Sequence, residues 1–208
     1  MSNVHLLIVD INLGKKYHSL LLEKLSESQI AKMLKFAKEN DQLRSLLSSY
    51  LKNQLSNSEE KINEFGKPYF PDAPRFNISH SGKYLVMALA DKEIGIDIEE
   101  NVTRNFSVLK KIFNEAEVKF LKNQEDFYYL WCSKESLIKC LGTTINMIKD
   151  IPSLPLNGIK TYRGINYRCH SLIYDNHIIS ITLKSSRPFN VHIDKIQKLP
   201  FIFRTDIK

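Results

Sequence analysis

The chain has 208 residues, with 30 lysines and arginines against 23 aspartates and glutamates, so its formal net charge is +7. Charged residues make up 25% and hydrophobic residues 43% of the chain, which excludes an intrinsically disordered protein. No apolar run reaches the roughly 18 residues of a membrane span, and the N-terminal segment lacks the features of a secretory signal. The positive charge indicates an anionic partner, such as nucleic acid, phospholipid, a phosphorylated ligand or an acidic protein.

The cysteines indicate a reducing compartment. Cys132, Cys140 and Cys169 are odd in number and form no C-x-x-C pair, which argues against a disulfide framework or a structural zinc site. We therefore expect a cytoplasmic enzyme or binding protein.

The N-terminal third predicts a strand followed by two helices. Apolar residues dominate the segment 4–9, which is typical of a first strand. Ser26-Glu27-Ser28-Gln29 has the form of a capping box, in which side chains satisfy the free N–H groups at a helix start. An apolar stripe at helical spacing follows, and a polar break at Asn40-Asp41 separates it from a second stripe.

The middle of the chain predicts a loop and then a β-hairpin. Three prolines between residues 66 and 80 exclude a long helix, so His80 is expected in a polar turn. The apolar run 84–90 and the alternating segment 94–99 are typical of two strands, and Asp91-Lys92-Glu93 resembles their turn.

The C-terminal half predicts helices and then strands. Asn114-Glu115-Ala116-Glu117 can cap a helix, a longer helix is expected from Gln124 to Leu141, and Gly142 suits its end. Residues 157–184 regain the character of strands. This order of elements predicts an α+β fold with two similarly organised lobes, residues 1–100 and 101–208.

Asp97 and Glu99 are the first candidates for chemistry. They are two residues apart on a predicted strand, so both point away from Ile94, Ile96 and Ile98. Paired carboxylates repel unless they are solvated or bridged by a cation, and oxygen-only ligation suits Mg²⁺. The alternative is an exposed strand face with ordinary surface acids.

Trp131, Glu135 and Lys139 are spaced by four on the predicted long helix, so they lie on one helical face. Glu135 would then be a third oxygen ligand or a base, and Lys139 a phosphate-binding cation. The alternative is a surface ion pair beside a tryptophan that anchors the core. Periodicity does not separate these interpretations.

His80 and Glu117 also have two interpretations each. Ser79, Ser81 and nearby backbone N–H groups beside His80 would suit a phosphate, although a lone histidine is more often an ordinary loop residue. Glu117 lies three residues after Asn114, so it is either a carboxylate at a helix start or part of a site.

Four motifs follow one another along the chain: Gly66-Lys67-Pro68, Phe76-Asn77-Ile78-Ser79-His80-Ser81, Gly95-Ile96-Asp97-Ile98-Glu99 and Trp131-Cys132-Ser133-Lys134-Glu135-Ser136-Leu137-Ile138-Lys139. Together they resemble the 4′-phosphopantetheinyl transferase superfamily, and the length of the chain resembles its longer, surfactin-type branch. The resemblance covers about residues 32–139 and adds little to the C-terminal third. It implies a pseudodimer of two α+β lobes with coenzyme A in the cleft between them.

The resemblance also implies an activity and roles for the matching residues. The activity is transfer of the phosphopantetheine arm of coenzyme A, as substrate, to a serine of an apo acyl or peptidyl carrier protein, with release of 3′,5′-ADP. The implied roles are Mg²⁺ ligation by Asp97, Glu99 and Glu135, pyrophosphate binding by Lys139, coenzyme A binding by Lys32, Lys35, Arg44, Lys67, Ser79 and His80, and activation of the nucleophile by Glu117. The base that accepts the serine proton stays open among Glu135, a Mg²⁺-bound water and Glu117.

The partners that we expect are coenzyme A and an acidic carrier protein, with neither nucleic acid nor a membrane as partner. A chain of this length would supply both lobes itself, so we expect a monomer. The loops around residues 101–126 are expected to receive the carrier. Two rival interpretations are an inactive relative that binds coenzyme A or a carrier, and a basic nucleic-acid-binding protein, against which stands the lack of a nucleic-acid-binding motif.

Overall fold

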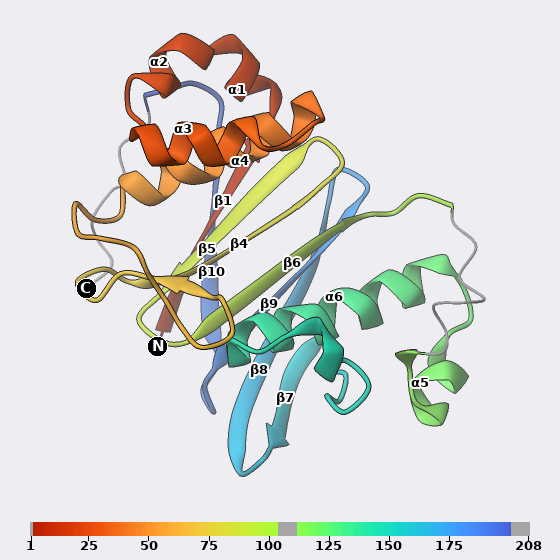
Figure 1. Cartoon of the computed structure of the whole chain (residues 1–208). Helices are drawn as coiled ribbons and strands as arrows, with labels where there is room; N and C mark the ends of the chain where they lie inside the picture. Colours follow the sequence, from red (N-terminus) through yellow and green to blue (C-terminus); the bar gives the residue numbers. More distant parts are fainter. Residues whose placement is uncertain (1, 104–111, 201–208) are drawn as a thin grey trace.

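The computed structural model describes residues 2–103 and 112–200, and Figure 1 shows their arrangement. The chain contains both helices and sheets, which confirms the predicted α+β class. In chain order the elements are β1 (Ser2–Asp10), α1 (Asn12–Lys16), α2 (His18–Leu22), α3 (Glu27–Leu34), α4 (Glu39–Asn53), β2 (Lys61–Ile62), β3 (Pro68–Tyr69), β4 (Arg75–Ser81), β5 (Tyr84–Ala90), β6 (Ile94–Glu100), α5 (Glu115–Phe120), α6 (Gln124–Leu141), a 3₁₀ turn (Ile145–Met147), β7 (Asn157–Tyr162), β8 (Ile165–Tyr174), β9 (His177–Lys184) and β10 (Phe189–Ile196).

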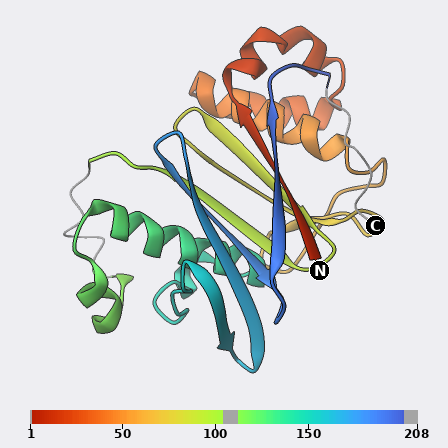
Figure 2. The ribbon, with the colours of Figure 1, turned by 180° about the vertical axis from the view of Figure 1, so that it is seen from behind.

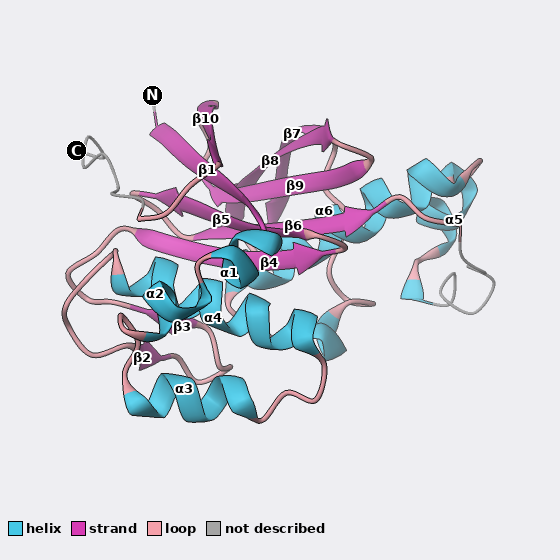
Figure 3. Ribbon diagram, turned by 90° about the horizontal axis from the view of Figure 1, so that it is seen from above, coloured by secondary structure: helices cyan, strands magenta, loops and turns pink. Residues whose placement is uncertain are grey.

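The first four-stranded sheet has the order β10-β1-β5-β4, and α1–α4 cover one of its faces (Figure 3). Alternate residues of β1 and β5, such as Leu7 and Met87, join Leu46 and Leu47 of α4 in one apolar core. β1 runs antiparallel to β5 and parallel to β10, and Figure 2 shows β1 and β10 side by side. The first and last described strands of the chain therefore lie together in this sheet.

The second sheet has the order β6-β9-β8-β7 and lies between the first sheet and α6. Ile94, Ile96 and Ile98 of β6 face the first sheet, in a core that includes Leu6 and Val86. On the other face of the second sheet, α6 packs against β8 through a separate core. The layers are thus helices, first sheet, second sheet, and α6 with α5.

The capping boxes are as predicted, but the break between the first two helices is not. Ser26 with Gln29 and Asn114 with Glu117 form reciprocal capping boxes, and the long helix spans Gln124–Leu141 with Gly142 in the left-handed conformation after it. The break lies at residues 35–38 rather than at Asn40-Asp41, because α4 already begins at Glu39.

Two predictions about the middle of the chain are wrong. The segment 77–82, expected as a polar turn, lies mostly in strand β4, so His80 lies on a strand. β5 and β6, expected as a hairpin, belong to different sheets, because β5 pairs with β1 and β4 whereas β6 pairs with β9. The short turn at residues 91–93 leads the chain from one sheet into the other.

The sheet boundaries differ from the predicted lobe boundary at residue 101. β6 precedes that boundary but belongs to the second sheet, and β10 follows it but completes the first sheet. Two four-stranded sheets, each with helices on its outer face, are compatible with a pseudodimer. The division into residues 1–100 and 101–208 stays a prediction.

Within the described ranges, no helix combines the length and apolar character needed to cross a bilayer. Cys132, Cys140 and Cys169 are free thiols, and all three are buried.

Candidate active site

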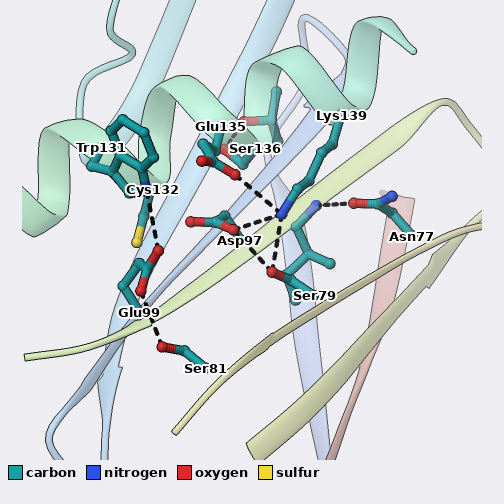
Figure 4. Close-up of polar contacts among 12 residues, drawn as sticks. Asn77, Ser79, Ser81, Asp97, Glu99, Trp131, Cys132, Glu135, Ser136 and Lys139 are labelled. Carbon is teal, nitrogen blue, oxygen red and sulfur yellow. Dashed lines mark hydrogen bonds and ion pairs between the residues drawn. The ribbon is translucent and has the colours of Figure 1, made fainter. Parts of the chain in front are cut away.

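The site lies where the edge strands of the two sheets meet. Two side chains of β4 replace backbone pairing there, because Asn77 Oδ1 accepts from the N–H of Ile96 at 2.8 Å and Ser81 Oγ accepts from the N–H of Glu100 at 3.0 Å. The side chains of β4 therefore lie between β4 and β6, and polar groups occupy the space between the two strands (Figure 4).

Asp97 lies at the centre of this space. The alternation of β6 turns it away from the isoleucine face, as predicted, and its residue is only 2% exposed. Its Oδ1 accepts from the hydroxyl of Ser79 at 2.9 Å and from Lys139 Nζ at 2.6 Å. Its Oδ2 is buried and has no hydrogen-bond partner among the described residues.

Gly95 allows α6 to approach β6 closely enough for these contacts. A Cβ atom at this position would overlap the carbonyl oxygen of Ser136 and the backbone nitrogen of Cys140. A buried hydrogen bond between Ser136 Oγ and Thr182 Oγ1, 2.7 Å long, holds the same part of α6 against β9. The glycine of the G-x-D-x-E motif is thus required by the packing of the helix on the strand.

Glu135 and Lys139 face Asp97 from adjacent turns of α6 (Figure 4). Lys139 Nζ lies 3.4 Å from Glu135 Oε2. Burial, and then the negative charge of Asp97, raise the pKa of Glu135 to about 7. Burial works against the Lys139 ammonium, but the carboxylates of Asp97 and Glu135 outweigh it and raise the pKa of Lys139 above its ordinary value. The face of α6 that carries Glu135 and Lys139 is therefore the face that lies toward Asp97.

Glu99 lies beside this cluster with different partners. Its Oε2 accepts from the Ser81 hydroxyl at 3.0 Å, and its Oε1 accepts from the indole N–H of Trp131 at 3.2 Å. Trp131 thus orients a carboxylate besides packing against apolar neighbours. In the part of the chain that the structure describes, no group of three or more acidic, histidine or cysteine side chains is assembled as a metal site as it stands.

Ser79 and His80 point to opposite sides of β4. Ser79 faces the cluster, where its hydroxyl also accepts from Lys139 Nζ at 3.0 Å, whereas His80 is exposed. Loss of water around part of the ring, and then the positive charges of Arg44 and Lys139, lower the pKa of His80. The two residues therefore do not form one unit, although both lie near Lys139.

The other predicted coenzyme A ligands are spread around the cluster. Arg44 on α4 donates to the carbonyl oxygen of Gly82 at 2.6 Å and to Asp41 at 2.7 Å. Lys67 donates to Ile94 O at 2.9 Å and to Glu93 at 3.1 Å, so it connects the β2–β3 region to the start of β6. Lys32 and Lys35 are exposed at the end of α3.

Glu117 is held apart from the carboxylate cluster by contacts of its own. Its oxygens lie 3.1 and 2.9 Å from Nζ of Lys134, a lysine of α6 with no exposed surface. They also accept from the N–H groups of Asn114 and Ser153, each at 2.9 Å. The role of Glu117 in activating a nucleophile stays a prediction.

Sequence reasoning did not predict the contacts that three side chains make. Asn77 and Ser81 bind the edge of β6, and Lys134 pairs with Glu117. The alternation of Asn77, Ser79 and Ser81 was a usable signal, because these three share one face of a strand. Lys134 offers no comparable signal, since its partner lies on another helix.

Comparison with known proteins gives a consistent result. A family model described as the 4′-phosphopantetheinyl transferase superfamily matches residues 93–182. The 4′-phosphopantetheinyl transferase Sfp of Bacillus subtilis (strain 168) is 31% identical over 166 residues, which cover 72% of this chain and 74% of that protein. Another 4′-phosphopantetheinyl transferase of Bacillus subtilis is 41% identical over 103 residues, 46% of each chain. The transferase gsp of Aneurinibacillus migulanus is 31% identical over 137 residues, 59% of this chain and 58% of that protein.

Proposed function

The chain belongs to the 4′-phosphopantetheinyl transferase superfamily, among relatives of the Sfp type, and from this premise we propose its reaction. The substrate is coenzyme A, and the acceptor is a serine of an apo acyl or peptidyl carrier protein. The serine oxygen forms a bond to the phosphorus that carries the pantetheine arm. The bond from that phosphorus to the leaving 3′,5′-ADP breaks, and the serine proton passes to a base.

One observation carries this proposal. Ser79 of β4, Asp97 of β6 and Glu135 of α6 all lie within 3.4 Å of a single atom, Lys139 Nζ. A lysine ammonium is a good partner for phosphate oxygens, and carboxylates beside it can hold a cation. The cluster therefore suits a pyrophosphate group.

The residues fit a magnesium ion. Carboxylate oxygens are the ligands that Mg²⁺ prefers, and the buried Oδ2 of Asp97 is an oxygen without a partner among the described residues. We assign Asp97, Glu99 and Glu135 to hold the ion. When bound, Mg²⁺ supplies positive charge against the pyrophosphate oxygens.

The protein's own groups divide the remaining work. Lys139 binds the pyrophosphate and stabilises the charge that develops on the leaving phosphate. Glu135, only partly exposed beside Lys139, receives the serine proton directly or through a water molecule. Trp131 and Ser81 keep Glu99 oriented through their hydrogen bonds.

Coenzyme A brings about four negative charges, which need cations beyond Lys139. We assign Arg44, Lys32 and Lys35 to its phosphates, with Ser79 and His80 toward the 3′-phosphoadenosine end. Lys67 would lie near the nucleotide. The Nε of Arg44 is buried without a hydrogen-bond partner among the described residues, which supports a ligand nearby.

The partner and its setting follow from the charge and the topology. A net charge of +7 suits an acidic carrier protein. We propose a monomer, since one chain supplies both edge strands of the site, β4 and β6. We propose a cytoplasmic location, which the three free thiols support.

The test is incubation of the protein with coenzyme A, Mg²⁺ and a panel of apo carrier proteins, followed by mass spectrometry of each carrier. We expect at least one carrier to gain one phosphopantetheine arm, and we expect chelation of the metal to prevent the gain. If coenzyme A binds but no carrier gains mass, the inactive relative is favoured. Retention on DNA with no binding of coenzyme A favours the nucleic-acid-binding protein.

A further inference from the structure

Lys134 and Glu117 form an ion pair inside the protein. The lysine side chain has no exposed surface and the glutamate side chain is 5% exposed. Removing two charges from water costs several kcal/mol per ion, so a buried ion pair contributes little net stability. A gain in stability alone is therefore a weak explanation for the presence of this pair. The position of this pair is therefore informative.

The pair ties together three segments that are separate in the sequence. Glu117 lies in α5, Lys134 lies in α6, and Glu117 Oε1 also accepts from the N–H of Ser153. α5 has only 6 residues, too few to be stable as an isolated helix. The ion pair is thus a principal anchor of α5.

A row of aromatic rings leads from this pair to the carboxylate cluster. Lys134 Nζ lies 5.7 Å from the ring centre of Phe113, and Phe113 contacts Phe127 edge to face at 5.5 Å. Phe127 stacks on Trp131 at 6.3 Å. Trp131 donates to Glu99 Oε1. Each contact in this row is direct, and its last member is a proposed metal ligand.

We propose that Glu117 and Lys134 are positioning residues for the transfer reaction. They hold α5 and the row of rings so that Trp131 keeps Glu99 oriented toward the cluster, and Glu117 does not itself touch the serine. This inference rests on the proposed function.

The surroundings of Glu117 support positioning over proton transfer. Both of its oxygens are bound to Lys134, and each also accepts a backbone N–H group. Burial acts to raise the pKa of Glu117, but hydrogen bonds from Asn114, Lys134 and Ser153 outweigh it, so the pKa is lowered. A base with a lowered pKa and no free oxygen is poorly suited to accept a proton.

The test compares Lys134→Met, Glu117→Gln, the double variant and Lys92→Met. Lys92→Met is the control, because Lys92 is an exposed lysine in the turn at residues 91–93, away from the region expected to receive the carrier. Trp131 is the single tryptophan of the chain, so intrinsic fluorescence reports directly on the row of rings. The measurements are kcat, KM for the carrier, Kd for coenzyme A, Trp131 emission and circular dichroism.

We expect Lys134→Met to lower kcat on the order of 10- to 100-fold and to shift Trp131 emission, because it leaves Glu117 buried without its partner. The Kd for coenzyme A should change less than about threefold, since most of its predicted ligands lie on other elements and Lys139 lies more than one turn away from Lys134 on α6. The double variant has no unpaired charge, so it should recover roughly tenfold of the lost kcat. If Lys134→Met does not fold, the double variant is measured in its place. A kcat of the double variant within about tenfold of the wild-type value supports the same conclusion.

Two results would overturn the proposal. One is that Glu117→Gln abolishes transfer and the double variant does not recover, which would give Glu117 a direct chemical role. The other is that Lys134→Met leaves both kcat and Trp131 emission unchanged. A wild-type protein that modifies no carrier refutes the proposed function instead, and the fluorescence comparison still tests the row of rings.

Discussion

Lys139 separates two carboxylates that would otherwise repel each other. Asp97 and Glu135 reach it from different elements, and only one oxygen of Asp97 has a hydrogen-bond partner within residues 2–103 and 112–200. A buried carboxylate oxygen without a partner is costly, so the position beside Oδ2 favours a cation. The same residues can therefore form an ion-pair cluster in the free protein and hold a cation during the reaction.

Replacing Asp97 with asparagine tests this assignment at one atom. Asp97→Asn keeps the size of the side chain but removes its charge, so transfer should fall roughly 10²–10³-fold, as when one group that stabilises a transition state is lost. Steady-state transfer with saturating Mg²⁺ is the measurement, and circular dichroism checks the fold. Wild-type rates in the folded variant would refute the role of Asp97.

The Glu117→Gln substitution should change how stability depends on pH. The pKa of Glu117 lies below its ordinary value of 4.5, so its ionised form stabilises the fold above that pH. At about pH 7 the variant should be less stable by roughly 3–5 kcal/mol, because it leaves Lys134 buried without a counter-charge. The difference should shrink as the pH falls below 4.5 and through the folded-state pKa of Glu117.

Denaturant unfolding at several pH values measures this difference. A difference in unfolding free energy that stays constant from about pH 7 down to about pH 3 would contradict the prediction.

The sequence predicts residues well where a local period decides their direction. Asp97 and Glu99 face away from the isoleucines because strand residues alternate, and Glu135 and Lys139 share a face because helical residues recur every 3.6 positions. The local period does not predict that Lys134 is buried, because its burial depends on the ion pair with Glu117 on another helix. The opposite directions of Ser79 and His80 were missed because β4 was expected to be a turn.

Among the elements, the contact of β6 with α6 determines the geometry of the site. Gly95 removes the side chain that would separate the strand from the helix, and Asp97 is only two residues further along β6. A change in this contact therefore moves Asp97 relative to Lys139.

Gly95→Ala should damage both stability and transfer. Its Cβ would overlap backbone atoms of Ser136 and Cys140, so we expect a loss of about 1–3 kcal/mol or more and a shift of β6 away from α6. Gly14→Ala is the control, because the nearest atoms to its Cβ would be side-chain atoms of Leu43 and Leu47, at 3.3 Å, rather than backbone atoms. Thermal unfolding and transfer rates are the measurements, and equal effects of the two substitutions would contradict the prediction.

The wrong hairpin shows why element order does not determine sheet order. Strands that are adjacent in sequence usually pair, and the turn at residues 91–93 is short enough for a hairpin. β6 pairs instead with β9, which begins at His177. No local pattern reports a partner so distant in the sequence, whereas the capping boxes are local and were predicted correctly.

At the scale of the whole molecule, the net charge of +7 should set the rate of encounter with an acidic carrier. Salt screens charges over about 10 Å at 0.1 M, so attraction between separated surfaces weakens as ionic strength rises.

We expect kcat/KM for the carrier to fall about tenfold between roughly 0.05 M and 0.5 M salt. The decrease should be smaller for a carrier whose surface acids are replaced by amides. Equal values at low and high ionic strength would show that the charge does not steer the carrier.

The pairing of β1 with β10 also determines when the first sheet can be completed during synthesis of the chain. Ser2 lies beside Phe189 and Val9 beside Ile196, so each residue of β1 is made 187 residues before its partner in β10. At 5–20 residues per second the ribosome needs roughly 10–40 s to make the chain between them. During that interval one edge of β1, with its buried residues Leu6 and Ile8, has no strand beside it, and open strand edges attract other chains. The nascent protein therefore depends on the much later strand β10 to cover the open edge of β1.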